Sequence, residues 1–94
     1  MAIVIDELKY TPEPMVAGGK VKATAKVSAD EGVASVRLYT PDYRTLEARD
    51  EGNGIFVIGT DVPYDADPGY YDVTLVVTDK KGDTNRKTVQ IRIG

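Results

Sequence analysis

Apolar and polar residues alternate with a period of two along most of the chain, which is the spacing of side chains on the two faces of a β-strand. The clearest segment is Lys20–Ala29, in which Val21, Ala23, Ala25 and Val27 share one face and mostly lysines occupy the other. Gly, Pro, Asn and Asp interrupt the alternation at short intervals, as they do in turns. No heptad or sustained 3.6-residue period occurs. The pattern therefore predicts an all-β domain.

The alternation predicts about seven strands, or eight if the first is split. We place them at Ile3–Leu8 with a continuation at 15–17, and at 20–29, 33–40, 43–49, 55–62, 70–78 and 86–93. Pro12 and Pro14 cannot donate ladder hydrogen bonds, so the first strand is predicted at an edge, where it kinks or switches sheets. Beyond 20–29, the residues predicted to face the core are Ala34, Val36, Leu38, Leu46, Ala48, Phe56, Ile58, Val62, Tyr71, Val73, Leu75, Val77, Val89, Ile91 and Ile93.

A chain of 94 residues is the size of one domain, and half-buried antiparallel strands in that length close best as two packed sheets. We interpret residues 1–94 as a single module from a larger protein, with Met1-Ala2 as an added start. Ala2–Ile5 is too short for a signal peptide, and no apolar run approaches the roughly 20 residues that span a membrane, so no direct membrane insertion is predicted.

Composition narrows the chemistry that the chain can perform. It contains no cysteine and no histidine, which removes the commonest metal ligands, general base and nucleophile–base pairs. The adjacent carboxylates Asp30-Glu31 and Asp50-Glu51 lie in predicted turns, where they cannot face each other across a cleft. A net charge of −3 argues against a nucleic-acid partner, which requires a basic face. We therefore predict that the module is not an enzyme.

Asp67–Asp79, with its Asp-x-Gly-x-Tyr-x-Val spacing, resembles the tyrosine corner and sixth strand of immunoglobulin-like sandwiches. The order of features along the whole chain resembles bacterial and archaeal immunoglobulin-like surface domains, and is similar to polycystic-kidney-disease-type (PKD) and fibronectin type III modules. The resemblance implies a two-sheet antiparallel sandwich of about seven strands with Greek-key connections. It also implies that Tyr71 buries its ring and directs its hydroxyl to a nearby backbone group.

Two features of related domains are missing. The PKD type carries a Trp-Asp-Phe-Gly-Asp-Gly-like run in its third strand region, where this chain has Val36–Asp42. Antibody-type domains need a cysteine pair and a tryptophan, and this chain has neither. Val73 stands at the place of the second cysteine, so we expect aliphatic packing to replace the disulfide.

Exposed tyrosines and arginines are the candidate binding residues. Aromatic side chains outside a core can stack on sugars or form a protein contact. The candidates are Tyr39, Tyr64, Tyr70, Arg37 and Arg92. Arg37, Tyr39 and Arg92 lie on one predicted sheet face, on which Asp72 is expected to pair with Arg37 or Arg92. Tyr64 and Tyr70 are predicted to lie in or beside loops, so the tyrosines do not share one face. The alternative is that the tyrosines pack under loops.

Three aspartates, Asp61, Asp65 and Asp67, share one predicted connection. Calcium is bound by carboxylates grouped in loops, and related surface sandwiches sometimes bind it there. Aspartate is also an ordinary turn residue, and no EF-hand spacing is present. We expect no cofactor, with calcium as the alternative.

The resemblance implies a function as a non-catalytic module of a cell-surface or secreted protein, serving as a spacer, assembly or adhesion unit. Its partners would be neighbouring domains, and protein or polysaccharide at the cell surface. A second hypothesis is a carbohydrate- or protein-binding accessory of an extracellular enzyme. A third is an intracellular interaction domain that adds a partner's strand at the Ile3–Leu8 edge.

Overall fold

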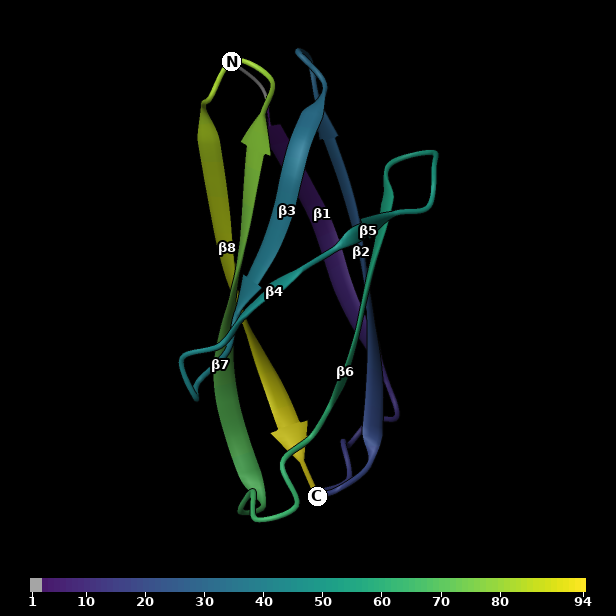
Figure 1. The fold of residues 1–94 in the computed structure, drawn as a ribbon, viewed down its shortest axis with the longest axis vertical. Helices are drawn as coiled ribbons and strands as arrows, with labels where there is room; N and C mark the ends of the chain where they lie inside the picture. The colour runs from purple at the N-terminus through teal and green to yellow at the C-terminus, as the bar shows by residue number, and fades with distance from the viewer. Residues whose placement is uncertain (1–2) are drawn as a thin grey trace.

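The computed structural model describes residues 3–94 as two packed antiparallel sheets (Figure 1). Met1 and Ala2, which we interpret as an added start, lie outside the described residues. The strands are β1 (Ile3–Thr11), β2 (Lys20–Ala29), β3 (Val33–Tyr39), β4 (Thr45–Glu47), β5 (Arg49–Asp50), β6 (Ile55–Asp61), β7 (Gly69–Asp79) and β8 (Thr84–Ile93). The first sheet has the order β1-β2-β6-β5 and the second has the order β4-β3-β7-β8.

The connections from β2 to β3, from β4 to β5 and from β6 to β7 each cross between the sheets. This is the arrangement of a Greek-key immunoglobulin-like sandwich. The predicted all-β immunoglobulin-like fold is therefore confirmed, with eight strands.

The core lies between the sheets and is almost entirely aliphatic. The four predicted inward residues of β2 are all buried, and so are Val73, Leu75 and Val77 of β7. β-branched side chains suit these positions because they pack well on a pleated surface. Val73, which is only 3% exposed, packs into this aliphatic core.

The first strand switches sheets after its prolines, as predicted. β1 pairs with β2 along its whole length, and Met15 then bridges in parallel to Ile93 of β8. The Met15 N–H donates to the Arg92 carbonyl oxygen at 2.8 Å, and Met15 is buried. One continuous segment therefore belongs to both sheets.

The prediction of a single strand at 43–49 is wrong. β4 pairs with β3 in the second sheet, whereas β5 pairs with β6 in the first. The chain crosses over at Ala48, whose N–H donates to the Val36 carbonyl oxygen at 2.8 Å. Leu46 and Ala48 still pack against the core from this crossing.

The prediction that Ala34 faces the core is also wrong, because Ala34 is exposed. The pairing of β3 with β7 shifts between Val33 and Ser35, as it does at a β-bulge. A bulge adds one residue to a strand, so the alternation changes phase there. Val36 and Leu38, which follow the bulge, are buried as predicted.

The sandwich measures 40 × 22 × 18 Å along its principal axes. Ile3 lies at one end of the long axis, beside the β7–β8 hairpin, and Gly94 lies at the other end (Figure 1). In the part of the chain that the structure describes, no helix is long and apolar enough to cross a membrane.

Candidate functional site

A cavity of about 390 Å³ lies between the two sheets, near the end that carries Gly94. Its inner wall is made by apolar side chains from both sheets, among them Leu8, Ala23, Leu38, Leu46, Ile58 and Ile91. Ala23 has the smallest side chain of these, and it lies opposite Ile58 on the neighbouring strand. Side chains of both sheets therefore bound the cavity.

The loop joining β3 to β4 forms one side of the cavity mouth. It closes through two backbone hydrogen bonds, from Thr40 N–H to the Arg44 carbonyl oxygen at 3.0 Å and from Tyr43 N–H to the Thr40 carbonyl oxygen at 3.1 Å. Tyr43 has a φ of 64°, in the left-handed region that non-glycine residues seldom occupy. Its side chain is 98% exposed, so the ring packs on nothing within the domain.

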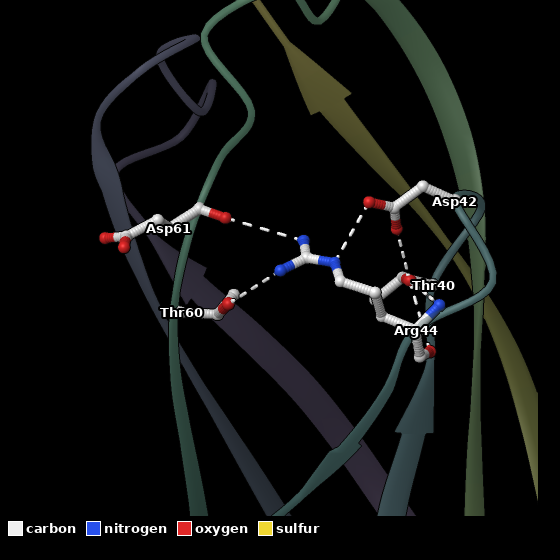
Figure 2. A network of polar contacts seen from close by, with 5 residues as sticks. All are labelled: Thr40, Asp42, Arg44, Thr60 and Asp61. Atoms are coloured by element: carbon white, nitrogen blue, oxygen red, sulfur yellow. Dashed lines mark hydrogen bonds and ion pairs between the residues drawn. The ribbon is translucent and has the colours of Figure 1, made fainter.

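Arg44 reaches from this loop across the mouth to β6 of the opposite sheet (Figure 2). Its Nε contacts Asp42 Oδ2 at 2.9 Å. Its Nη1 donates to Thr60 Oγ1 at 3.4 Å, and its Nη2 donates to the Asp61 carbonyl oxygen at 3.5 Å. A carboxylate, a hydroxyl and a carbonyl, supplied by both sheets, thus converge on one guanidinium.

Asp42 is held ionised by its neighbours. The Thr40 hydroxyl donates to Asp42 Oδ1, and this hydrogen bond is the main cause that lowers the pKa of the carboxyl below its ordinary value. Partial burial opposes the shift, and the positive charge of Arg44 adds to it. The Asp42 carboxylate is therefore a fixed negative charge at the mouth near neutral pH.

The three aspartates proposed for calcium all lie at this mouth, together with Asp42. Asp61 contacts Arg44 through its carbonyl oxygen, and Figure 2 shows its carboxylate directed away from the guanidinium. Over residues 3–94, no group of three or more acidic, histidine or cysteine side chains is placed to hold a metal ion. Calcium binding thus gains no support from the geometry and stays a prediction.

Tyr71 lies at the start of β7 and lines the cavity. Its hydroxyl donates to the Asp67 carbonyl oxygen at 2.7 Å, four residues earlier in the chain, and its ring packs against the core. This contact ties the β6–β7 connection to the sheet. We predict that this contact stabilises the fold and does not take part in ligand binding.

The other predicted binding residues do not form one surface. Arg37, Tyr39, Tyr70 and Arg92 lie on the outer face of the second sheet, and Tyr64 lies in the β6–β7 connection beside Gly18. Tyr39 is opposite Thr74, four residues along β7 from Tyr70, which separates the rings by about 13 Å along the strand.

The ion pairs on this face also differ from the prediction. Arg37 Nε pairs with Glu47 Oε1 at 3.5 Å, so it does not pair with Asp72. The guanidinium of Arg92 lies 6.0 Å from the centre of the Tyr70 ring, at the limit of a cation–π contact. Asp72 is instead opposite the uncharged Gln90. Each of the two arginines therefore contacts the residue opposite it on the neighbouring strand. The pairing of β4 with β3, which brings Glu47 opposite Arg37, was not predicted from the sequence.

Side chains of β8 cover the free edge of β1. Asn85 Nδ2 donates to the Ile3 carbonyl oxygen at 2.9 Å, and Lys87 Nζ donates to the Asp6 carbonyl oxygen at 3.2 Å. At the other end of the strand, Arg92 N–H donates to the Tyr10 hydroxyl at 3.0 Å. Burial raises the pKa of the Tyr10 phenol above its ordinary value, although the Arg92 N–H acts in the opposite direction. Two carbonyls that a partner's added strand would use at Ile3–Leu8 are thus already occupied.

Two polar features were missed in the sequence. Asp79 is 2% exposed, and its Oδ1 accepts from the N–H groups of Lys81 and Asp83 at 3.0 and 2.9 Å, which organises the β7–β8 hairpin. An aspartate before Lys80-Lys81-Gly82 is the available signal, since aspartate favours this kind of turn. The contact of Arg44 with Thr60 joins residues 16 apart, and no local pattern signals it.

Sequence comparisons identify no relative: no protein-family model matches the chain, and no curated protein matches it. Solved structures do match over 99% of its length. The PKD1 domain of Vibrio anguillarum Epp has a TM-score of 0.66 and 23% identity over 94% of that chain. The PKD1 domain of the Vibrio cholerae metalloprotease PrtV has a TM-score of 0.65 and 22% identity over 98%.

The fibronectin(III)-like modules of Clostridium thermocellum CbhA match with a TM-score of 0.64 and 18% identity. The present chain spans only 46% of that CbhA chain. Identities this low establish the fold alone. The PKD domains match even though this chain lacks the Trp-Asp-Phe-Gly-Asp-Gly-like run, because strand order and core packing define the sandwich. The chain therefore has the immunoglobulin-like sandwich fold of PKD and fibronectin type III-like modules.

Proposed function

We propose that this chain is a non-catalytic module of a longer cell-surface or secreted protein, in which it holds neighbouring domains apart. The observation that carries this proposal is the placement of Ile3 and Gly94 at opposite ends of a 40 Å sandwich (Figure 1). A polypeptide continuing at both ends would run straight through the module. The PKD and fibronectin(III)-like neighbours support the proposal, since the CbhA structures are described as modules and the present chain spans 46% of the matched CbhA chain.

Several features make the module suitable as a rigid element. The sheets share one aliphatic core, and the strand that bridges both sheets, from β1 to Met15, prevents them from sliding independently. The hydrogen bonds from β8 to the β1 carbonyls close one long side of the sandwich.

The experiment is a replacement in the parent polypeptide. Residues 3–94 are exchanged either for an unrelated sandwich of the same long axis or for a flexible Gly/Ser linker of equal residue number. A spacer predicts that the unrelated sandwich preserves the parent's activity and that the flexible linker does not, because a random coil fixes no distance between its ends. Loss of activity with both replacements would show that the module's own surface is required.

A second candidate is a binding accessory attached to an enzyme, and PrtV is a metalloprotease that carries a PKD1 domain. The observation in its favour is the exposure of Tyr70 and Tyr64, at 65% and 87%. A glycan array and a cell-wall pull-down test it, with Tyr39→Ala, Tyr64→Ala and Tyr70→Ala as variants. Binding that all three variants retain would remove the tyrosines from consideration.

A further inference from the structure

We propose that the cavity between the sheets is a binding site for an amphiphilic cation, a molecule with an apolar body and an ammonium or guanidinium head group. The body would lie between the sheets, and the head would lie at the mouth, on the acceptors that Arg44 now occupies. This site is separate from the spacer role and does not depend on it.

The interior suits an apolar body. A volume of about 390 Å³ falls within the range of small-molecule sites. The walls include Ala23, Leu38, Ile58 and Ile91, whose side chains offer no hydrogen-bond partner. Water needs two to four polar partners to be held in a cavity, so it is poorly stabilised here. An alkyl or aromatic group gains contacts on both sheets when it displaces that water.

The mouth suits a cation. Asp42 Oδ2, Thr60 Oγ1 and the Asp61 carbonyl oxygen are all acceptors, and all three face a single guanidinium (Figure 2). They come from a loop of the second sheet and a strand of the first, so the fold fixes their spacing. A ligand ammonium that donates two or three hydrogen bonds can use the same atoms.

Arg44 is displaceable from this position. Its side chain is 41% exposed, and its contacts with Thr60 and Asp61, at 3.4 and 3.5 Å, are long. Exposed ion pairs contribute little stability, so the arginine can turn to solvent at small cost. The structure thus has a cation of its own at the place where the ligand's cation would bind.

The charges at the mouth favour a positively charged ligand over a negatively charged one. Four aspartates, Asp42, Asp61, Asp65 and Asp67, line the cavity together with Arg44 as the single cation. Charges within a Debye length of about 8–10 Å act together at physiological salt. The summed potential attracts an amphiphilic cation and repels an anion of the same shape.

The test compares three probes with the same eight-carbon chain: octylammonium, octanoate and octanol. Binding is measured below their micellar concentrations by calorimetry and by methyl NMR shifts. We expect octylammonium to shift the methyl signals of Leu38, Ile58 and Ile91. We expect octanoate to bind at least about tenfold more weakly, because a charge-assisted hydrogen bond corresponds to about a factor of ten or more.

Variants of the mouth separate the contributions. Arg44→Ala removes the competing cation and should tighten octylammonium binding. Asp42→Asn removes the fixed negative charge and should weaken it by about tenfold. Asp30→Asn is the matched control, since Asp30 is an exposed aspartate in the β2–β3 turn and does not line the cavity; it should leave the affinity unchanged.

Filling the cavity gives an independent readout. Ala23→Leu places a larger side chain in the interior and should abolish binding without lowering the melting temperature; Ala23→Val serves if the leucine variant fails to fold. The proposal is overturned if octylammonium binds neither the wild-type chain nor Arg44→Ala. It is equally overturned if octanoate binds as tightly as octylammonium, or if the shifted methyl groups lie outside the cavity.

Discussion

The two halves of the sandwich enclose the core to different degrees. In the half near the β7–β8 hairpin, which we call the closed half, Val27, Val36 and Val77 are at most 1% exposed. In the half near Gly94, the open half, Val21, Ala23, Leu38 and Ile91 are 7–8% exposed and surround the cavity. Both halves are built from the same strands and similar residues, so side-chain type does not explain the difference.

The difference lies in how the sheet edges are covered. In the closed half, β5 pairs with β6 at Phe56 and Val57, and Asn85 and Lys87 cover the edge of β1. β5 does not extend alongside the rest of β6, and there Arg44 is the side chain that crosses between the sheets. A sandwich therefore needs its two long sides closed as well as apolar inner faces.

The comparison is tested most strongly where the two halves meet, at two leucines that face each other across β3 and β7. Leu38 and Leu75 are cross-strand partners, but only Leu38 lines the cavity. We expect Leu75→Ala to lower the free energy of unfolding by about 3–5 kcal/mol, because it creates a new void in a filled region. Leu38→Ala, which enlarges an existing space, should cost about 2 kcal/mol. Equal losses in urea unfolding would contradict the distinction between the filled core and the cavity wall.

A second test removes the polar anchor of the closed half. Asp79→Ala leaves the N–H groups of Lys81 and Asp83 without their buried acceptor, and should cost about 2 kcal/mol of unfolding free energy. Asp83→Ala is the control: its exposed side chain should change stability by less than about 0.5 kcal/mol. The hairpin does not depend on the Asp79 carboxylate if both variants unfold at the same denaturant concentration.

The corresponding contact in the open half is that of Tyr71. Tyr71→Phe removes the hydrogen bond to the Asp67 carbonyl oxygen and should lower stability by about 1 kcal/mol while leaving any ligand binding intact. Tyr43→Phe, which alters a fully exposed ring, should have no measurable effect. An unchanged melting temperature in Tyr71→Phe would count against its role as a tyrosine corner.

The smallest expected effect is a response of the mouth to acid. Since the pKa of Asp42 is lowered in the folded chain, its ionisation stabilises the fold above the ordinary pKa of 3.8 and ceases to do so as pH falls through the lower folded value. Thr40→Val removes the main cause, and should raise the Asp42 pKa toward 3.8 in a carboxyl NMR titration. A pKa that stays low in that variant would assign the shift to Arg44.

The sequence predicted the long regular strands better than the bulge in β3 and the crossing between the sheets. Alternation identified the buried faces of β2 and β7, because a half-buried strand must place every second side chain inside. It failed at Ala34, where a bulge changes the phase, and at 43–49, where the chain changes sheets within one short run. Both failures are backbone events that the alternation of residue types does not encode.

Only some residues of the candidate site were predicted from the sequence. Asp61, Asp65, Asp67 and Tyr71 were identified from their residue types, and all lie at the cavity. Asp42, Arg44 and Thr60 were not, because the β3–β4 loop meets β6 only once the two sheets are packed. The cavity itself likewise depends on how the side chains of the two sheets face each other.

The opposite placement of Ile3 and Gly94 has a mechanical consequence. A load pulling on both ends acts along β1 and β8, and along the parallel bridge from Met15 to Ile93. Ladder hydrogen bonds lie across the strands, so such a load shears many of them together instead of opening them one at a time. Single-molecule stretching should therefore need a higher force between these two ends than between Ile3 and the β7–β8 hairpin, which lies beside it.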